Sequence, residues 1–317
     1  MPAAALMIFS NIWNRKQLNR LFGKERNIMS EKIAVVTDSN SGISQEEAKK
    51  LGIFVLPMPF IIDGETFYED VNLSQREFYQ KLKGKAVIST SQPMVGDVLE
   101  LWDKVLAQYD SLIHIPMSSG LSGSCATACT LASQYEGRVF VVNNHRISVP
   151  QRQSVLDALT LIRAGKSAGM IREILEKESF ESSIYIMLDT LEYLKKGGRV
   201  TPAAAAVAAV LRIKPVLQIQ GEKLDAFAKA RSEKLARTIM IDALRTDIET
   251  RFGGMDQVYL YAAHTDNDET ARSFVVQMEQ ELHARVVYSE PLSLSISCHT
   301  GPGALALGCS RKISRYL

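Results

Sequence analysis

Two clusters of hydroxyl side chains are the residues of this sequence best suited to hold a ligand. Residues 89–93 read STSQP, so three hydroxyls precede a proline that can open the next helix. Residues 118–124 read SSGLSGS, where glycines let the backbone approach a ligand and hydroxyls can donate to an anion. A helix N-cap would also account for the first cluster, so both clusters need support from other residues.

Two glycine-containing motifs add basic side chains to these hydroxyls. Residues 195–199 read KKGGR and end a predicted helix that starts near Leu191; a helix C-cap explains the glycines but not Arg199. Residues 299–303 read HTGPG and follow an alternating apolar stretch, so His299 is expected at the end of a strand. His264 has a similar but weaker context. Jointly, the four motifs predict a site of Ser, Thr, His and Arg donors for a carboxylate or a phosphate.

Several common catalytic and nucleotide motifs are missing from the sequence. No lysine stands where a Walker-type phosphate loop requires one, and there is no GxGxxG. GxSxG is absent too, although residues 120–123 come near it. A hydrolase or phosphotransferase that uses Ser119 or Ser122 remains an alternative without an assigned base. A protein that binds a sugar phosphate or another small anion is a further alternative.

The overall composition favours a small-molecule or protein partner. The 317 residues carry a formal net charge of +2 with acids and bases mixed, which gives no footprint for nucleic acid. The four cysteines form no CxxC pair and no zinc-finger spacing, so we expect no metal, no disulfide framework and reduced thiols in the cytoplasm. No apolar run reaches the roughly 18 residues of a transmembrane helix.

Residues 31–181 alternate between predicted strands and predicted helices, which is typical of a mainly parallel sheet with helices on both faces. Apolar runs predict strands at residues 33–37, 54–62, 111–116 and 138–142. Helices are expected from residue 45 and at residues 74–82, 95–107, 122–134 and 151–163. Ligands bind beyond the carboxyl ends of such strands, where this chain has its Ser and Thr clusters.

Residues 182–317 predict a second, mixed α/β domain. Strands are expected at residues 183–188, 214–220, 257–262, 285–287 and 292–297, with a hairpin turn at residues 221–223. Residues 1–30 are set apart as an N-terminal extension: a short apolar start is followed by a basic stretch, which is the wrong order for a secretory signal. We expect this extension to be an artefact of an upstream start codon or of cloning, or a disordered basic appendage.

Five motifs give the chain a resemblance to the DegV family of fatty-acid-binding proteins, which includes the B subunits of bacterial fatty acid kinase. They are VTDS at residues 36–39, TSQP at 90–93, SSGLSG at 118–123, KGGR at 196–199 and HTGPG at 299–303. The resemblance runs from about Lys32 to the C-terminus. It implies a two-domain DegV-like α/β fold with an acyl chain buried in a tunnel between the domains.

The resemblance also implies roles for single residues. Thr90 and Ser119 would hold the fatty-acid carboxylate, with supporting or partner-facing residues that comprise Ser118, Arg199, His299 and Arg231. The protein would act as a carrier with no catalytic residue and no cofactor of its own. It would present the carboxylate to an ATP-dependent kinase subunit for conversion to an acyl phosphate, and transient membrane contact is compatible with this role.

The physical chemistry of such a ligand agrees with this reading. Burial of an acyl chain of about sixteen carbons, as in hexadecanoate, contributes on the order of 10 kcal/mol before ordering costs. The carboxylate must accept hydrogen bonds in a pocket of low polarity, and hydroxyls supply them. The preferred chain length and unsaturation depend on the shape of the tunnel, which the sequence alone does not fix.

Overall fold

The computed structural model describes residues 31–84, 86–207, 213–221 and 223–317. Residues 33–317 form one compact unit. The extension predicted at residues 1–30 therefore lies outside the described residues. The boundary expected between residues 181 and 182 falls directly before a strand and stays a prediction.

A four-stranded parallel sheet occupies the first half of the compact unit. Its strands are β1 (Ile33–Asp38), β2 (Phe54–Leu56), β6 (Ser111–Ile115) and β7 (Val139–Val141), in the order β2-β1-β6-β7. All three pairings are parallel. Ile33 and Val35 of β1 pack into one buried cluster, whereas Ala34 and Val36 pack into another on the opposite face. A parallel strand buried on both faces in this way reads as a continuous apolar run.

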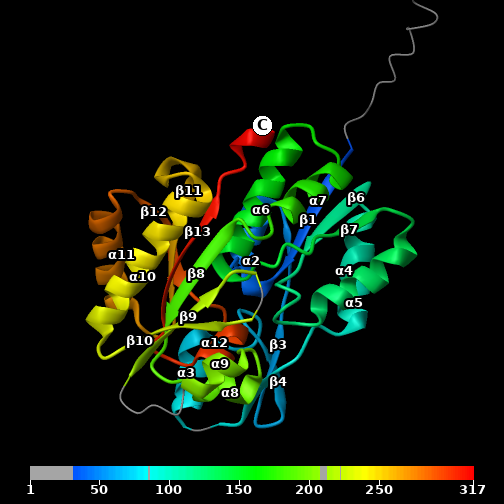
Figure 1. The fold of residues 1–317 in the computed structure, drawn as a ribbon. Helices are drawn as coiled ribbons and strands as arrows, with labels where there is room; N and C mark the ends of the chain where they lie inside the picture. The colour runs from blue at the N-terminus through cyan, green and yellow to red at the C-terminus, as the bar shows by residue number, and fades with distance from the viewer. Residues whose placement is uncertain (1–30, 85, 208–212, 222) are drawn as a thin grey trace, which may run out of the picture. The chain divides into compact units, whose positions relative to one another are not determined.

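Helices cover both faces of this sheet, which confirms the predicted fold class (Figure 1). Residues of α6 (Ser148–Arg163) and α7 (Ala168–Lys177) pack on one face with α2 (Gln45–Leu51), and residues of α4 (Val95–Leu106) and α5 (Ser124–Ala132) pack on the other. The helix starts follow local signals. At α2, for example, the Ser44 side chain accepts a hydrogen bond from the backbone N–H of Glu47.

The apolar run at residues 54–62 forms two strands, not the single strand that its composition predicts. β2 belongs to the parallel sheet, whereas β3 (Pro59–Ile62) pairs antiparallel with β4 (Glu65–Tyr68) and β5 (Ile88–Thr90) in a separate sheet. Pro57 and Pro59 lack the N–H that a continuous ladder requires, so the chain leaves one sheet between them and enters the other. Helix α3 (Gln75–Lys83) packs with this small sheet.

A six-stranded mixed sheet occupies the second half, where a mixed α/β fold is predicted. Its order is β10-β9-β8-β13-β11-β12, and only β11 and β12 pair in parallel. The strands are β8 (Ser182–Met187), β9 (Lys214–Ile219), β10 (Asp225–Ala230), β11 (Val258–His264), β12 (Val286–Pro291) and β13 (Leu305–Arg311). The antiparallel pairing expected here is confirmed, because Gln218 of β9 faces Asp225 of β10, whereas residue 222 of the predicted turn lies outside the described residues.

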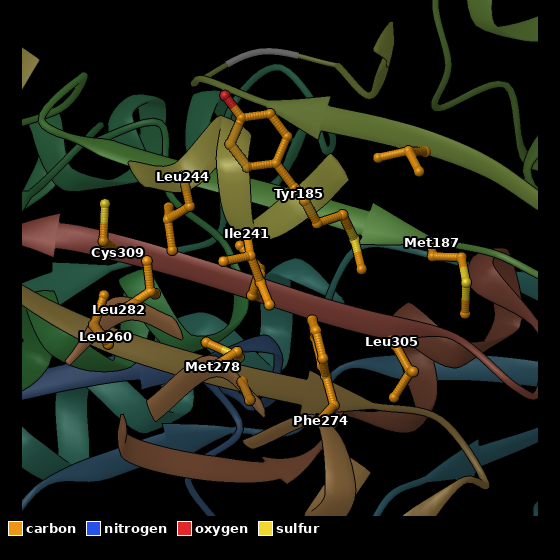
Figure 2. Packing of buried hydrophobic residues seen from close by; sticks show 14 of the residues in the cluster. Tyr185, Met187, Ile241, Leu244, Leu260, Phe274, Met278, Leu282, Leu305 and Cys309 are labelled. Atoms are coloured by element: carbon orange, nitrogen blue, oxygen red, sulfur yellow. The ribbon is translucent and has the colours of Figure 1, made fainter. Parts of the chain in front are cut away.

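One face of the mixed sheet is covered by α10 (Glu233–Asp247) and α11 (Asp268–Leu282). Figure 2 shows side chains of the two helices packed against those of β8, β11 and β13, among them Tyr185, Met187, Ile241, Leu260, Phe274 and Leu305. Alternate residues of the same strands point to the other face, because successive side chains of a strand alternate. That other face borders the functional site.

The strand expected at residues 292–297 is wrong: these residues enter helix α12 (Leu294–Thr300). The alternation of apolar residues with serines predicts a strand with one solvent-exposed face, yet the serines are buried. Ser297 accepts a hydrogen bond from the Tyr79 hydroxyl at 2.9 Å, and its own hydroxyl donates to the Ser293 carbonyl at 3.0 Å. His299 consequently lies in the last turn of a helix and not at a strand end. Strand β13, in the interior of the sheet, was not anticipated.

Candidate functional site

A large cavity lies between the open face of the mixed sheet and the loops at the carboxyl ends of the parallel strands. It holds about 960 Å³ of empty space, counted to include solvent at its mouth. Most of its wall is apolar. Among the side chains of the wall are Met58, Leu121, Val149, Ile186, Leu194, Ile219, Tyr261, Leu292 and Ile296.

Small residues on the central strands leave room for this cavity. Ala263 of β11 and both Ala306 and Gly308 of β13 line the wall. Their neighbours in sequence, such as Leu305 and Leu307, pack in the core on the opposite face of the sheet. Along β13, the large residues therefore fill the face of the sheet that packs against the helices, and the small residues leave space for the cavity on the other face.

One end of the cavity is polar. Its wall there includes Thr90, Ser91, Gln92, Ser122, Arg199 and His299, which we call the polar end. Thr90 Oγ1 and His299 Nε2 lie 2.9 Å apart, although they belong to β5 and α12. The hydroxyl motif and the histidine motif of the sequence thus meet directly.

His299 is neutral at pH 7. Burial, and to a smaller extent the positive charge of Arg199, lower the pKa of the ring to about 4. A neutral ring with its proton on Nε2 donates that proton to Thr90. The hydroxyl proton of Thr90 is then free to donate to a ligand in the cavity.

Gly197 leaves the space that the His299 ring occupies. A Cβ atom at this position would lie 2.1 Å from Nδ1 of His299. Gly198 follows with φ of 67° and ends helix α8 (Glu192–Gly197) in the left-handed region. The two glycines of the KKGGR motif therefore have different causes, and a helix cap explains only the second.

Arg199 brings a positive charge to the polar end. Its Nη1 donates to the Gly197 carbonyl, and its Nε donates to the Leu121 carbonyl at 3.4 Å. The guanidinium thereby links the glycine turn after α8 to the serine loop that starts α5. A carboxylate at this end would be near a permanent cation.

Ser122 is the hydroxyl of the serine loop that reaches the cavity. Ser122 lines the wall, and its Oγ accepts a hydrogen bond from the Ser124 N–H at 3.2 Å, so its own proton remains available to a ligand. Ser118 is buried and donates to the Gly221 carbonyl at 3.1 Å. Ser119 is half-buried on the same loop and is not among the described residues that line the cavity.

Two other basic residues of the sequence motifs lie away from the cavity. Arg231 is exposed just after strand β10. His264 ends β11 and lines a different, more polar surface cleft, where its Nε2 is 3.8 Å from Asp268 Oδ1. The described structure therefore brings Thr90, Arg199 and His299 together and leaves these two outside the group.

Asp38 positions the serine loop and was not singled out as a site residue. Its carboxylate is buried and accepts hydrogen bonds from the Met117 N–H at 2.7 Å, the Asn40 N–H at 2.9 Å and the Gln151 amide at 3.2 Å. Burial raises the pKa of Asp38 to about 6, and these hydrogen bonds oppose the shift. The signal was present in the VTDS motif, because an aspartate that ends an apolar strand needs partners.

The side chains of the cavity wall are suited to binding an amphipathic ligand. Among the residues that the structure describes, no group of three or more His, Cys, Asp or Glu side chains is placed to hold a metal ion. Within the same described ranges, no helix combines the length and apolar character needed to span a bilayer. Hydroxyls and one guanidinium at the end of an apolar chamber suit a ligand with an anionic head and a long apolar tail.

Comparisons with known proteins agree with this geometry. A family model whose description reads "Uncharacterised protein, DegV family" matches residues 32–312. A DegV domain-containing protein from Listeria innocua is 32% identical over 288 residues, which cover 90% of this chain and 100% of the relative.

Two solved structures are similar at 28% identity, and each comparison covers 89% of this chain and 100% of the other. One is described as "Fatty Acid Binding of a DegV family Protein from Thermus thermophilus" and has a TM-score of 0.79. The other, with a TM-score of 0.78, is described as DegV, a fatty acid binding protein from Bacillus subtilis.

Proposed function

Because this chain belongs to the DegV family, we propose that it binds one long-chain fatty acid in the cavity, with the carboxylate at the polar end. The observation that carries the proposal is the amphipathic wall: an apolar chamber ends in Thr90, Arg199 and His299. The Thermus thermophilus and Bacillus subtilis relatives are described as fatty acid binding. The same ligand class fits this chamber.

The acyl tail provides the affinity and the polar end provides the orientation. Each buried CH₂ contributes about 0.8 kcal/mol, so a chain such as hexadecanoate is held mainly by the apolar wall. Thr90 and Ser119 hold the carboxylate, with Ser122 and Arg199 beside them and Ser118 fixing the loop. A carboxylate with these partners avoids the cost of an unpaired buried charge.

The protein acts as a carrier that presents the carboxylate to a kinase partner, which converts it to an acyl phosphate with ATP. Exposure of Ser91 and Gln92 at the polar end supports access from outside. Arg231, exposed after β10, is the proposed contact with the partner. The carrier is cytoplasmic, and it meets membranes only transiently to exchange its ligand.

A hydrolase that works alone with Ser119 or Ser122 receives less support. Neither serine has a histidine or carboxylate among its hydrogen-bond partners in the described part of the chain. The histidine of the cavity wall pairs with Thr90 instead. A nucleophile needs a base within hydrogen-bond reach.

Organic extraction of the purified protein tests the carrier proposal. We expect one equivalent of long-chain fatty acid per chain by mass spectrometry, and saturable binding of palmitate or oleate after delipidation. Recovery of no fatty acid, together with no binding of either added acid, would contradict it. The partner is tested separately: the loaded protein should give acyl phosphate only when a fatty acid kinase subunit and ATP are both added.

A further inference from the structure

A second group of polar side chains lines the cavity outside the polar end. It comprises Asn40, Ser148 and Ser295, which we call the second polar patch. Ser295 and His299 are four residues apart on α12, so Ser295 lies about 6 Å along the helix from the histidine. Because both groups line the same cavity, an acyl chain that starts at the polar end can reach this patch.

Ser148 is the residue of the patch with a free hydroxyl. It lines the cavity at the first position of α6, and its side chain has no hydrogen-bond partner among the described residues. A serine at a helix start usually caps the helix, but here the N-cap position is Ile147 and no side chain caps the backbone. The usual structural reason for a serine at this position is therefore missing.

Asn40 supplies a second donor that has only a weak partner. The residue is 2% exposed, and its Nδ2 is 2.8 Å from the sulfur of Met117, which is a poor acceptor. Its Oδ1 is already occupied, since it accepts from the Ser293 hydroxyl at 3.2 Å and from the Ser295 hydroxyl. The amide group therefore has donor capacity next to the cavity but no comparable acceptor capacity.

A plain alkyl chain does not match these donors. It removes water from the wall and offers no acceptor in return, so each donor left unpaired lowers the affinity. A chain with an oxygen at the right carbon restores the lost hydrogen bonds. The three residues of the patch carry no charge, which favours a neutral oxygen substituent over a second carboxylate.

We propose that the second polar patch recognises a hydroxyl or oxo group within the acyl chain, and that oxygenated long-chain fatty acids are preferred ligands. This inference rests on the proposed fatty-acid function and names the substrate class for the same cavity. Ser148 and Asn40 donate to the substituent oxygen, and Ser295 holds Asn40 in place. The polar end binds the carboxylate of plain and oxygenated acids alike.

The test measures the dissociation constants of stearate and of a series of hydroxystearates that differ only in the position of the hydroxyl. For the delipidated wild-type protein, we expect at least one internal isomer to bind about fivefold more tightly than stearate, which corresponds to one net hydrogen bond. In Ser148→Ala, that ratio should fall below about twofold, while stearate itself binds more tightly. These opposite changes in the two ligands separate loss of the donor from general damage to the cavity.

Thr90→Ala is the matched control, because it changes the polar end and not the patch. It should weaken stearate and the preferred isomer by the same factor and leave their ratio unchanged. Stearate binding with no isomer preferred, or a preference that survives Ser148→Ala, would overturn this inference alone. Failure of stearate and of every isomer to bind would overturn the proposed function, and this inference with it.

Discussion

Thr90 and His299 are separated by 209 positions in the sequence and meet at 2.9 Å. Neither motif indicates the other when read alone, since a cap explains the first and a structural turn explains the second. Their contact places both motifs at the same end of the cavity. Burial keeps His299 neutral, so the polar end offers hydroxyl donors and one cation, Arg199, to an anionic head group.

Single alanine substitutions on the serine loop identify the second carboxylate ligand. We expect Ser119→Ala to weaken palmitate binding about tenfold, because a hydrogen bond to a charged group contributes about 1.5–3 kcal/mol. Ser122→Ala should have a smaller effect. Isothermal titration calorimetry with the delipidated variants measures both effects. A loss of affinity confined to Ser122→Ala would instead identify Ser122, which lines the cavity, as the second ligand of the carboxylate.

Gly197→Ala tests the space reserved for His299. The added Cβ would lie 2.1 Å from the ring, so the ring must move and its contact with Thr90 is lost. We expect palmitate to bind about tenfold more weakly, as for loss of one charge-assisted hydrogen bond. Gly96→Ala in α4 is the control, because a Cβ there meets no atom within 4 Å. Equal affinities of the two variants would contradict the role assigned to Gly197.

At the scale of elements, the sequence predicted most helices and strands but misread the segment that carries His299. Apolar periodicity identified the parallel sheet, because strands buried on both faces form continuous apolar runs. Periodicity failed for α12, because its buried serines alternate with apolar residues just as the solvent-exposed positions of a half-buried strand do. Hydrogen bonds from distant residues, such as Tyr79, satisfy these serines, and a local pattern contains no sign of them.

Glu69 holds the start of α12 and makes the stability of this element dependent on pH. Its carboxylate accepts from the Leu294 N–H at 2.8 Å and from the Gln75 amide at 3.2 Å. Burial raises the pKa of Glu69 to about 7, from 4.5. A raised carboxyl pKa contributes stability that is complete below pH 4.5 and is lost as the pH rises through 7.

Glu69→Gln should therefore gain stability relative to the wild type as the pH rises from about 5 to 8. Thermal unfolding across this range measures the difference in midpoint between the two proteins. Glu65→Gln, which changes an exposed carboxylate on the neighbouring strand, serves as the control. A constant difference between wild type and Glu69→Gln at all pH values would disprove the proposed ionisation of Glu69.

The motifs predicted the polar end better than the body of the cavity. Thr90, Arg199 and His299 were found because hydroxyl, glycine and basic residues cluster at the ends of predicted elements. Asn40 and Ser148 have no such signal, since their partners are set by the packing of distant segments. The chamber itself arises from the small residues of β11 and β13, which a one-dimensional pattern reads only as weak strand formers.

For the molecule as a whole, the cavity is bordered by a cluster of buried hydrophobic residues, so the ligand is expected to act as part of the core. A ligand that binds only the folded state at 100 times its dissociation constant adds about 2.7 kcal/mol to the free energy of unfolding. For a chain of this length, that corresponds to a rise of about 4–5 °C in the unfolding midpoint. Differential scanning calorimetry with and without palmitate measures the shift, and an unchanged midpoint would argue against a ligand in the cavity.

The depth of the chamber can be altered without touching the opposite core. Ala306→Leu adds a side chain on the cavity face of β13, whereas Leu305 and Leu307 still pack beneath α10 and α11. We expect this variant to bind stearate at least tenfold more weakly than the wild type, while laurate loses less. A uniform loss for both acids would mean that the substitution damages the fold and not the tunnel.

The alternation along β8, β11 and β13 has a consequence for how such proteins diverge. Alternate side chains belong to the buried cluster beside the cavity and to the buried cluster beneath the helices, so ligand preference and thermal stability depend largely on different positions of the same strands. Selection can then change the shape of the chamber by exchanging residues such as Ala263 and Ala306 at little cost to the core. Paralogues that arise by gene duplication can therefore evolve preferences for different fatty acids while they keep the same fold.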